Sequence, residues 1–437
     1  MSDLTYIMSG ISMVLKNGKI CKRDNENYAN MVRDTIRDFK SEINFEMMFN
    51  AYQEDTLMDG YLAKYDYFGS KWHADSGGLQ VITAGRVITE ELKEKVYKMQ
   101  ALHSDYAMCF DELPINVTAY AGSASRVDLS GRQFIEEWKE ERAAKTGLNV
   151  KKQIEIIHKM KSKTKVFLIC QGNEIQDFVD FYDTAMAHIP KEYYSTLAGI
   201  AISAACTGIG KLETIKLLGS YKFMKIPKDV GNKLHLLGYG SINRLYPMLL
   251  LKASGYLDAD ITFDSSSHAM NTLLGEVMVA EGELFPNGGV IPFGKVRTPR
   301  SDRIFQYLYN KYSEVFKKYY NNISFDEYLK IVCDDLTSSK KFNLDCKTGV
   351  TIHLYTRFLI AYESFYNFAE SLIKIRNDID NRKFDSNINA INALINVKTK
   401  EDFVKWFASQ SHCIPSNAIK RFKTLNEAQN QQGVLPI

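Results

Sequence analysis

The stretch NVKKQIEIIHKMKSKTKVFLICQGN, residues 149–173, holds the pattern on which the fold class depends. Apolar residues recur at every third and fourth position of its first part, which indicates an amphipathic helix. The stretch then continues into VFLIC, a short apolar run with strand propensity, and a polar turn begins at Gln171. A helix followed by a short buried strand is the repeating unit of a parallel α/β fold.

Strand-like runs of this kind recur between about residue 70 and residue 270. They are YAMCF at 106–110, VFLIC at 166–170, LAGIAI at 197–202, KLHLLGYG at 233–240 and ADITF at 259–263. Another helix-like segment, SGRQFIEEWKEERAAK, spans 130–145. Successive strand ends lie about 25 to 60 residues apart, which suits the βα units of a (β/α)8 TIM-like barrel with insertions. A doubly wound open sheet is the alternative.

Beyond about residue 300 the pattern changes to long, aromatic-rich helical stretches at 303–320, 353–379 and 401–410. Tyr and Phe at helical spacing favour core packing over a platform on which bases stack. We therefore expect an α/β barrel domain over 1–300, with its motifs in 70–270, and a mainly α-helical C-terminal region over 301–437 packed on the barrel.

Composition is that of an ordinary globular protein. The chain has 437 residues, 45% of them apolar, and its 55 basic and 52 acidic residues leave a net charge of +3. Contact with a nucleic acid would therefore need a local basic face. Seven scattered cysteines and the lack of a roughly 18-residue apolar stretch predict a reduced, cytoplasmic protein, in the host cytoplasm if it is phage-encoded, with no membrane partner.

Polar side chains stand where several of the strands end. Asp75 opens the segment DSGGLQ, Asp111 follows YAMCF, Gln171 follows VFLIC, and Asp264 follows ADITF. An Asp after a strand is commonly a helix N-cap or a turn residue. Because the carboxyl ends of parallel strands converge on one mouth, however, the four together predict a site there.

The segment DSGGLQ, at 75–80, resembles the DSGG(F/Y)Q signature of the queuine and archaeosine tRNA-guanine transglycosylases. Further matches follow in the order of that family: FDELP at 110–114, CQGN at 170–173, AGIA at 198–201, LLGYG at 236–240 and TFDSSS at 262–267. The ordered set covers about 70–270 and is far more specific than any one motif.

The resemblance implies a role for each strand-end residue. Asp264 would attack the anomeric carbon of a guanosine nucleotide and form a covalent glycosyl-enzyme intermediate, and Asp75 would act as general acid and base. Asp111 would accept hydrogen bonds from N1 and the 2-amino group of the purine. Gln171 and the backbone N–H of Gly199 would donate to its 6-oxo group.

The same resemblance implies further substrate-binding residues. Ser76, Gly77 and Gly78 would let the backbone approach the ligand closely. Ile200 and Leu237 complete the substrate-binding set.

Several positions depart from the family pattern. Leu79 stands where the family has Phe or Tyr, Leu113 replaces a Cys near the base pocket, and Leu237 stands for Met. After Asp264 the chain reads SSSHAMN, whereas the bacterial tRNA enzymes carry a proline and arginines that read the anticodon loop. The exchange machinery is retained, but no anticodon-reading machinery is evident.

These departures favour a resemblance to the 7-deazaguanine DNA transglycosylases of phages and some bacterial islands. Such enzymes exchange guanine in DNA for a base such as 7-cyano-7-deazaguanine. The expected partners are DNA, single-stranded or with a flipped base, and a free 7-deazaguanine base. The alternatives are a tRNA-guanine transglycosylase with divergent anticodon recognition and a non-catalytic partner subunit that binds nucleic acid.

Phosphate-binding residues are predicted beyond the last strand. The basic stretch GKVRTPRSDR, at 294–303, could hold phosphates through Lys295, Arg297, Arg300 and Arg303, although a solvated loop explains it equally well. His73 and His268 flank the proposed aspartates, where they would touch a phosphate or the sugar, or serve a structural role.

No cofactor is expected. The tRNA enzymes bind a structural zinc ion through CxCxxC and a distant His. Here the corresponding region holds only the isolated Cys333, Cys346 and His353, whose spacing forms no strong metal motif. A structural zinc remains the alternative.

Overall fold

A computed structural model of the chain describes the barrel strands, three of the helices around them, two short hairpins and one long C-terminal helix. The described residues are 4–9, 30, 33–39, 42–52, 71–78, 87–116, 133–203, 219–239, 248–249, 252, 257–266, 276–279, 289–292, 310, 314, 324, 354–380, 402 and 405.

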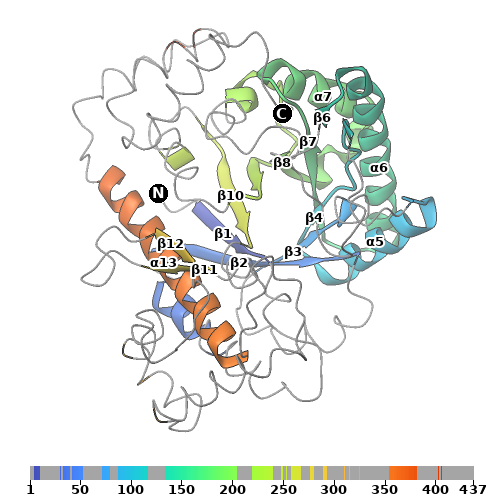
Figure 1. Ribbon diagram of the computed structural model, residues 1–437. Helices are drawn as coiled ribbons and strands as arrows, with labels where there is room; N and C mark the ends of the chain where they lie inside the picture. Colours follow the sequence, from blue (N-terminus) through green and yellow to red (C-terminus); the bar gives the residue numbers. More distant parts are fainter. Residues whose placement is uncertain are drawn as a thin grey trace.

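Eight parallel strands close into a barrel, in which β1 pairs with β10 (Figure 1). In order around the barrel they are β1 (Leu4–Met8), β2 (Asn44–Asn50), β3 (Trp72–Asp75), β4 (Tyr106–Met108), β7 (Lys165–Cys170), β8 (Leu197–Ser203), β9 (Lys233–Leu237) and β10 (Asp260–Ser265). Closure confirms the predicted (β/α)8 TIM-like barrel and excludes the open sheet.

Helices α5 (Glu90–His103), α6 (Lys139–Lys159) and α7 (Ile175–Ala187) lie outside the strands that they connect (Figure 1). The second predicted helical segment forms the C-terminal part of α6. The segment predicted at 130–145 is helical in α6 only from Lys139, because Gln133–Phe134 forms strand β6 and Glu136–Trp138 forms a 3-10 turn, η3. Gly147 lies inside α6, where a Cβ atom would stand 2.2 Å from the carbonyl oxygen of Ala185. The glycine thus allows α6 and α7 to pack closely.

Shorter elements complete the description. A second 3-10 turn, η4 (Lys191–Thr196), leads into β8. Two antiparallel hairpins are formed by β5 (Ile115–Asn116) with β6 (Gln133–Phe134), and by β11 (Glu276–Val279) with β12 (Gly289–Pro292). Both lie outside the closed sheet.

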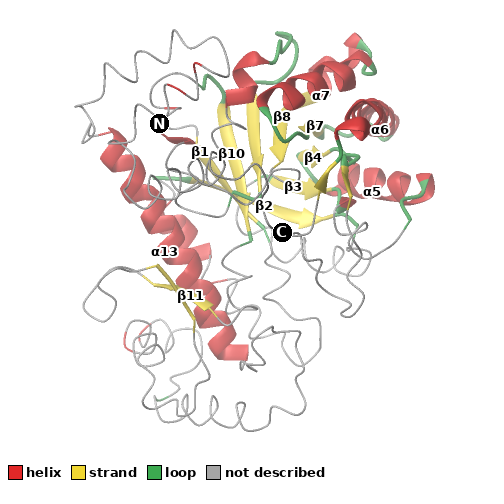
Figure 2. Cartoon of the chain, turned by 45° about the horizontal axis from the view of Figure 1, so that its top comes forward, coloured by secondary structure: helices red, strands yellow, loops and turns green. Residues whose placement is uncertain are grey.

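Helix α13 (Leu354–Asp380) runs along the outer face of β1, β2 and β10 (Figure 2). Its Phe365 and Phe368 are buried and contact the rings of Tyr6 and Phe263, which lie on β1 and β10. These aromatic residues therefore serve core packing, as their spacing predicts. The boundary expected near residue 300 and the helices expected at 303–320 and 401–410 lie largely outside the described residues.

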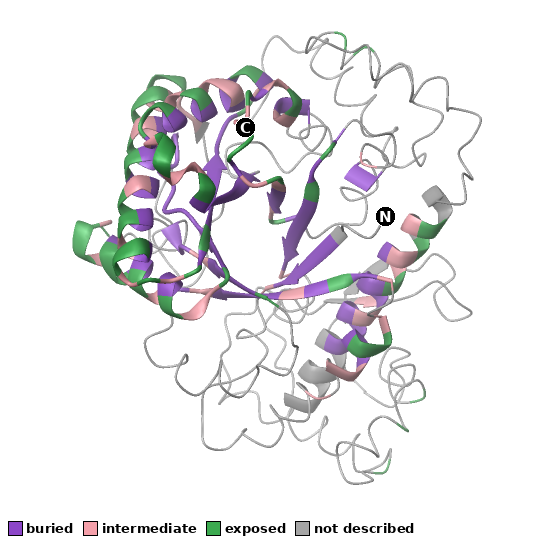
Figure 3. Ribbon diagram, turned by 180° about the vertical axis from the view of Figure 1, so that it is seen from behind, coloured by how far each residue is buried: buried purple, intermediate pink, exposed green. Residues whose placement is uncertain are grey.

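The core has two layers, as the burial colours of Figure 3 show for the strands and the inner sides of the helices. One lies between the strands and the helices, and the other fills the barrel. In the inner layer, His73 on β3 stacks on His235 on β9 with ring centroids 6.2 Å apart. Because β3 and β9 stand on opposite sides of the closed sheet, this contact crosses the barrel interior.

Two smaller observations concern the cysteines and the helices. Cys109 and Cys170 are free and buried, which fits reduced thiols. Among the described helices, none has both the length and the apolar character needed to cross a membrane.

Candidate active site

Four predicted side chains meet at the carboxyl end of the barrel. Asp75 ends β3, Asp264 is the penultimate residue of β10, Asp111 lies three residues after β4, and Gln171 follows β7 directly. They are also coupled electrostatically, because the charge of Asp264 acts on Asp75 and the charge of Asp75 acts on Asp111. The barrel thus gathers residues from four strands into one cluster.

Asp264 is held by hydrogen-bond donors from the residues that directly follow two other strands, β9 and β1. The backbone N–H of Gly238 donates to Oδ1 over 2.7 Å, and the hydroxyl of Ser9 donates to Oδ2 over 3.2 Å. Gly238 has a φ of 75°, a conformation that glycine adopts without strain, so the turn after β9 directs its N–H at the carboxylate. The two donors fix the orientation of the carboxylate.

Asp75 has a different environment, which raises its pKa to about 6. Burial is the largest cause, because it disfavours the charged form, and the negative charge of Asp264 adds to it. The backbone N–H groups of Ser76 and Gly77 partly offset this shift by donating to the carboxylate. At neutral pH, Asp75 is therefore poised to exchange a proton.

Asp111 and Gln171 form a buried pair. The amide Nε2 of Gln171 donates to Oδ2 of Asp111 over 2.5 Å, and only 7% of Asp111 is exposed. Burial raises the pKa of Asp111 to about 7, although the bond from Gln171 works in the opposite direction. A carboxyl acceptor and an amide thus lie side by side at the mouth.

Gly199 lies in an irregular part of β8. The register with β7 shifts there, so that Val166 pairs with Leu197 and Phe167 pairs with Gly199. Gly199 has a φ of 147°, and a Cβ atom would stand 1.9 Å from the carbonyl oxygen of Lys233. Any side chain would therefore push β8 away from β9, which explains the glycine at this position.

The segment after β3 also needs its glycine. Gly77 has a φ of 74°, and a Cβ atom would lie 2.5 Å from Cβ of Tyr52. The atoms that leave no room for a side chain at Gly77 therefore belong to the protein itself and not to a ligand. The hydroxyl of Ser76 is buried and accepts a hydrogen bond from the N–H of Gly78. These residues shape the turn that carries Asp75.

Ile200 and Leu237 differ in their access to the mouth. Leu237 is half-buried at the end of β9. Ile200 is fully buried and lies between Gly199 and Ala201 on β8, so its side chain points to the opposite face of the strand. The role of Ile200 and Leu237 in substrate binding stays a prediction.

Glu112 anchors the chain next to Asp111. Its carboxylate binds Lys93 of α5 over 2.8 Å and Arg142 of α6 over 3.3 Å, while its backbone N–H donates to Thr146. Asn149 donates to the carbonyl oxygen of Phe110 on the other side of Asp111. The backbone on both sides of Asp111 is therefore tied to α6.

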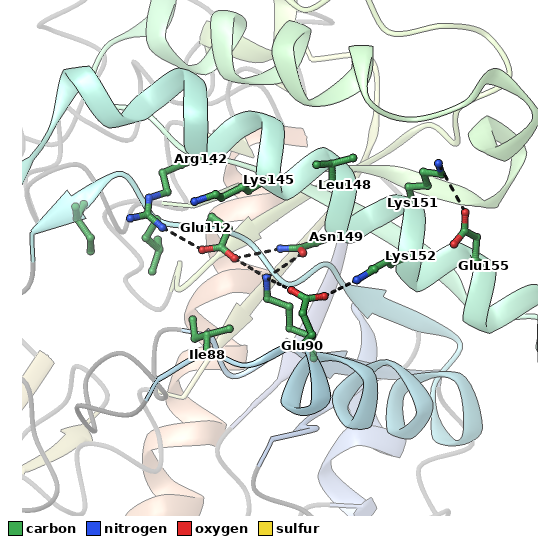
Figure 4. Close-up of a pocket in the computed structure, with 13 residues that line it drawn as sticks. Ile88, Glu90, Glu112, Arg142, Lys145, Leu148, Asn149, Lys151, Lys152 and Glu155 are labelled. Carbon is green, nitrogen blue, oxygen red and sulfur yellow. Dashed lines mark hydrogen bonds and ion pairs between the residues drawn. The ribbon is translucent and has the colours of Figure 1, made fainter.

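A cavity of about 800 Å³ lies beside this anchor, between α5 and α6 (Figure 4). Its cations are paired with acids: Lys152 with Glu90, and Lys151 with Glu155. Leu113 also lines it. The charged residues that border the cavity are thus paired with residues of opposite charge. Its wall includes Glu112, which follows Asp111.

His73 does not lie at the mouth. It is fully buried inside the barrel, where its Nε2 pairs with the carboxylate of Glu46 on β2. Burial lowers the pKa of His73 and so favours its neutral form, although the pair with Glu46 works against this shift. The structure therefore gives His73 the structural role and excludes contact with a phosphate or sugar at the mouth.

The remaining predicted residues lie outside the described part of the chain. They are the phosphate-binding candidates Lys295, Arg297, Arg300 and Arg303, His268, Leu79, and the zinc-ligand candidates Cys333, Cys346 and His353. Within the described residues, no group of three or more His, Cys, Asp or Glu side chains is arranged to hold a metal ion.

Two residues of the site are absent from the sequence-based set. Ser9 follows β1 and His235 lies within β9, where its Nε2 is 3.5 Å from Oδ1 of Asp264. The pattern of strand ends gives no signal for Ser9, because β1 precedes the region in which the strand pattern is recognisable. His235 stands inside an apolar run and resembles a core residue.

Comparisons with known proteins leave the family open. No protein-family model matches the chain, and no curated protein is similar to it in sequence. Among solved structures, a family 123 glycoside hydrolase from Clostridium perfringens, studied for glycolipid glycan hydrolysis, is 10% identical with a TM-score of 0.25. That match covers 87% of this chain and 71% of the hydrolase. A likeness this low carries no argument about function.

Proposed function

We propose that this chain is a guanine transglycosylase that exchanges guanine in DNA for a 7-deazaguanine base. One observation carries the proposal: the mouth holds two neighbouring aspartates with contrasting environments. Asp264 accepts two hydrogen bonds that fix its orientation, which suits a nucleophile, whereas the pKa of Asp75 is raised to about 6, which suits an acid and base. A second acceptor, Asp111, lies beside them.

The first half of the exchange removes guanine. An oxygen of Asp264 forms a bond to C1′ of the target nucleotide, the bond from C1′ to N9 breaks, and its electron pair leaves with guanine. The proton that the departing base requires comes from Asp75, whose raised pKa keeps part of the population protonated near neutral pH. Polymer and enzyme are then joined by a glycosyl ester.

The second half reverses this chemistry with a different base. N9 of the incoming 7-deazaguanine attacks C1′, its proton passes to Asp75, and the bond between C1′ and Asp264 breaks. Two displacements at C1′ retain its configuration, and no energy source is needed because one glycosidic bond replaces another. The same two carboxyl groups therefore serve both directions.

Base selection rests on Asp111, Gln171 and the backbone of Gly199. A guanine edge presents two donors, N1–H and the 2-amino group, next to one acceptor, the 6-oxo group. Asp111 supplies the acceptor, and the Gln171 amide at 2.5 Å supplies a donor beside it. Adenine would present the opposite pattern at its 6-position and leave buried polar groups unpaired.

DNA is proposed as the polymer because SSSHAMN follows Asp264 where the tRNA enzymes place arginines. A guanine inside a duplex does not reach carboxyl groups at a barrel mouth, so the enzyme extrudes the base or acts on single strands. The alternative functions are a tRNA-guanine transglycosylase and a non-catalytic partner subunit, and a test must distinguish both from this proposal.

The deciding experiment incubates the protein with radiolabelled guanine and either single-stranded DNA or an anticodon stem-loop RNA. Label in DNA alone supports the proposal, and label in RNA alone supports the tRNA enzyme. Polymer binding without label in either would identify a non-catalytic subunit. Mass analysis of nucleosides from host DNA and tRNA, after expression with a 7-deazaguanine supply, identifies the inserted base.

A further inference from the structure

Beneath the mouth of the barrel, one buried side chain directs a polar atom at Asp264. His235 on β9 is fully buried. Its Nε2 lies 3.5 Å from Oδ1 of Asp264 and has no hydrogen-bond partner among the residues that the structure describes. Because buried polar atoms almost always have partners, this exception points to a function.

The position of the proton on His235 follows from its neighbours. Nδ1 lies 2.8 Å from the hydroxyl of Thr262, which is able to donate to it. A deprotonated Nε2 would direct its lone pair at the negative carboxylate of Asp264, and the two would repel. The proton therefore lies on Nε2, and Thr262 donates to Nδ1.

The ring of His235 is fixed in place from two sides of the barrel interior. It stacks on His73, at 6.2 Å between centroids, and packs against Phe167, at 5.6 Å. A gap of 3.5 Å is long for a hydrogen bond. Catalytic hydrogen bonds are often long without substrate and tighten when it binds, so a small shift of Asp264 would close this one.

Resting on the proposed function, we infer that His235 is a positioning residue that assigns different tasks to the two oxygens of Asp264. Oδ1 accepts the 2.7 Å bond from Gly238 and faces the imidazole N–H, whereas Oδ2 accepts the longer bond of 3.2 Å from Ser9. Oδ2 is therefore the oxygen that bonds to C1′. Oδ1 becomes the carbonyl oxygen of the ester.

This arrangement acts mainly on the second half of the exchange. When the bond from Oδ2 to C1′ breaks, its electron pair returns to the carboxylate, and the imidazole N–H stabilises the charge that returns to Oδ1. In the first half, the same donor withdraws electron density from the nucleophile and gives no acceleration. His235 therefore speeds breakdown of the glycosyl ester more than its formation.

The test measures the two halves separately. An end-labelled single-stranded DNA oligonucleotide with one guanine is mixed with enzyme, and the covalent adduct is followed on a denaturing gel, first as it forms and then during a chase with free guanine. His235→Phe keeps an aromatic ring without the N–H, and His235→Gln keeps a donor near the position of Nε2. His158→Phe makes the same exchange on α6, where His158 bonds to Thr196.

In His235→Phe we expect breakdown to slow about tenfold while formation stays within about twofold, so that adduct accumulates. His235→Gln restores breakdown, and His158→Phe behaves as wild type. Should the Phe variant not fold, Thr262→Val provides the test, because it keeps the ring and removes the donor that fixes its tautomer. It should also accumulate adduct.

Equal slowing of formation and breakdown in the folded variant would indicate a structural role and overturn the inference. So would breakdown at the wild-type rate in His235→Phe, or in Thr262→Val where that variant replaces it. A wild-type enzyme that forms no adduct with this DNA or with an anticodon stem-loop RNA would instead overturn the proposed function, and this inference with it. Adduct formation by the wild-type enzyme thus distinguishes failure of this inference from failure of the proposed function.

Discussion

Asp75 at the end of β3 and Asp264 at the end of β10 lie close enough for the charge of Asp264 to raise the pKa of Asp75. Burial is the larger cause, and together the two raise this pKa to about 6. Asp264 itself accepts hydrogen bonds from Gly238 and Ser9. Two residues of one type thus have contrasting environments, which supports the proposed division into an acid and a nucleophile.

Replacing Asp264 with Ala should abolish exchange and covalent adduct while the fold is retained. The substitution removes the carboxylate that forms the ester, but leaves Asp75, Asp111 and Gln171 in place. Thermal unfolding should show a folded protein, and base binding measured by calorimetry should stay within about threefold of wild type. Full turnover by this variant would remove Asp264 from the mechanism.

The two halves of the exchange should depend on pH in opposite directions. Adduct formation needs protonated Asp75, so its rate should fall as pH rises through about 6. Adduct breakdown needs the ionised form, so its rate should rise over the same range. Rapid-quench measurements on either side of this pH, at saturating base, check the sign. A parallel rise of both rates would contradict the assignment of a single acid and base.

Asp111→Asn should weaken base binding and stabilise the fold. The amide presents donors to the donors of guanine, and each unpaired buried polar group costs about 1 to 3 kcal/mol. Calorimetry with guanine, and with hypoxanthine as the analogue that lacks the 2-amino group, measures this loss. Equal affinity of the wild type for both bases would contradict the role of Asp111.

The stability effect of Asp111→Asn has a definite sign. The pKa of Asp111 is about 7 in the folded protein, above its ordinary value of 3.8. The folded state thus retains a proton that the unfolded chain releases, and the wild type loses stability as pH rises between these two values. Asn does not titrate, so the variant should gain stability relative to wild type over this window. Thermal unfolding below pH 3.8 and above pH 7 tests this.

Glu112→Gln should loosen the segment that carries Asp111. Glu112 is buried and pairs with Lys93 and Arg142, so the change removes a buried carboxylate charge from both cations and costs about 3 kcal/mol. Denaturant unfolding measures this loss, and base binding should weaken in parallel. Glu155→Gln is the matched control, because its pair with Lys151 is exposed and contributes about 0 to 1 kcal/mol. Equal losses of unfolding free energy in the two variants would show that Glu112 does not hold the segment that carries Asp111.

The sequence predicts those parts of the site that follow a recognisable strand. Asp111, Gln171 and Asp264 each end a short apolar run, and that local pattern suffices to place them at one mouth. Ser9 has no such signal: it meets Asp264 only because β1 closes the barrel against β10, a contact between residues 255 positions apart. Barrel closure is a property of the whole sheet, so the five residues LTYIM of β1 do not predict it.

Other differences also have physical reasons. Gly147 interrupts the helical pattern between two segments, yet close packing against α7 compensates for its poor helix propensity, and α6 runs through it. In the sequence, His73 is a candidate for contact with a phosphate or sugar, and His235 resembles a core residue. Their stacking across the barrel depends on strand register, which only the assembled sheet determines.

The last prediction concerns the polymer: the enzyme should incorporate labelled guanine into DNA and leave an anticodon stem-loop RNA unlabelled, because serine, histidine and asparagine follow Asp264 where the tRNA enzymes have arginines. If phosphates are held by Arg297, Arg300 and Arg303, binding should fall steeply with salt, and removing one true contact should make the slope shallower by about one unit. Single-stranded or mismatched DNA should react at least as well as duplex, since extruding a paired base costs a few kcal/mol. Incorporation into RNA but not DNA, at matched salt and with the same incoming base, would replace the DNA assignment with that of a tRNA-guanine transglycosylase.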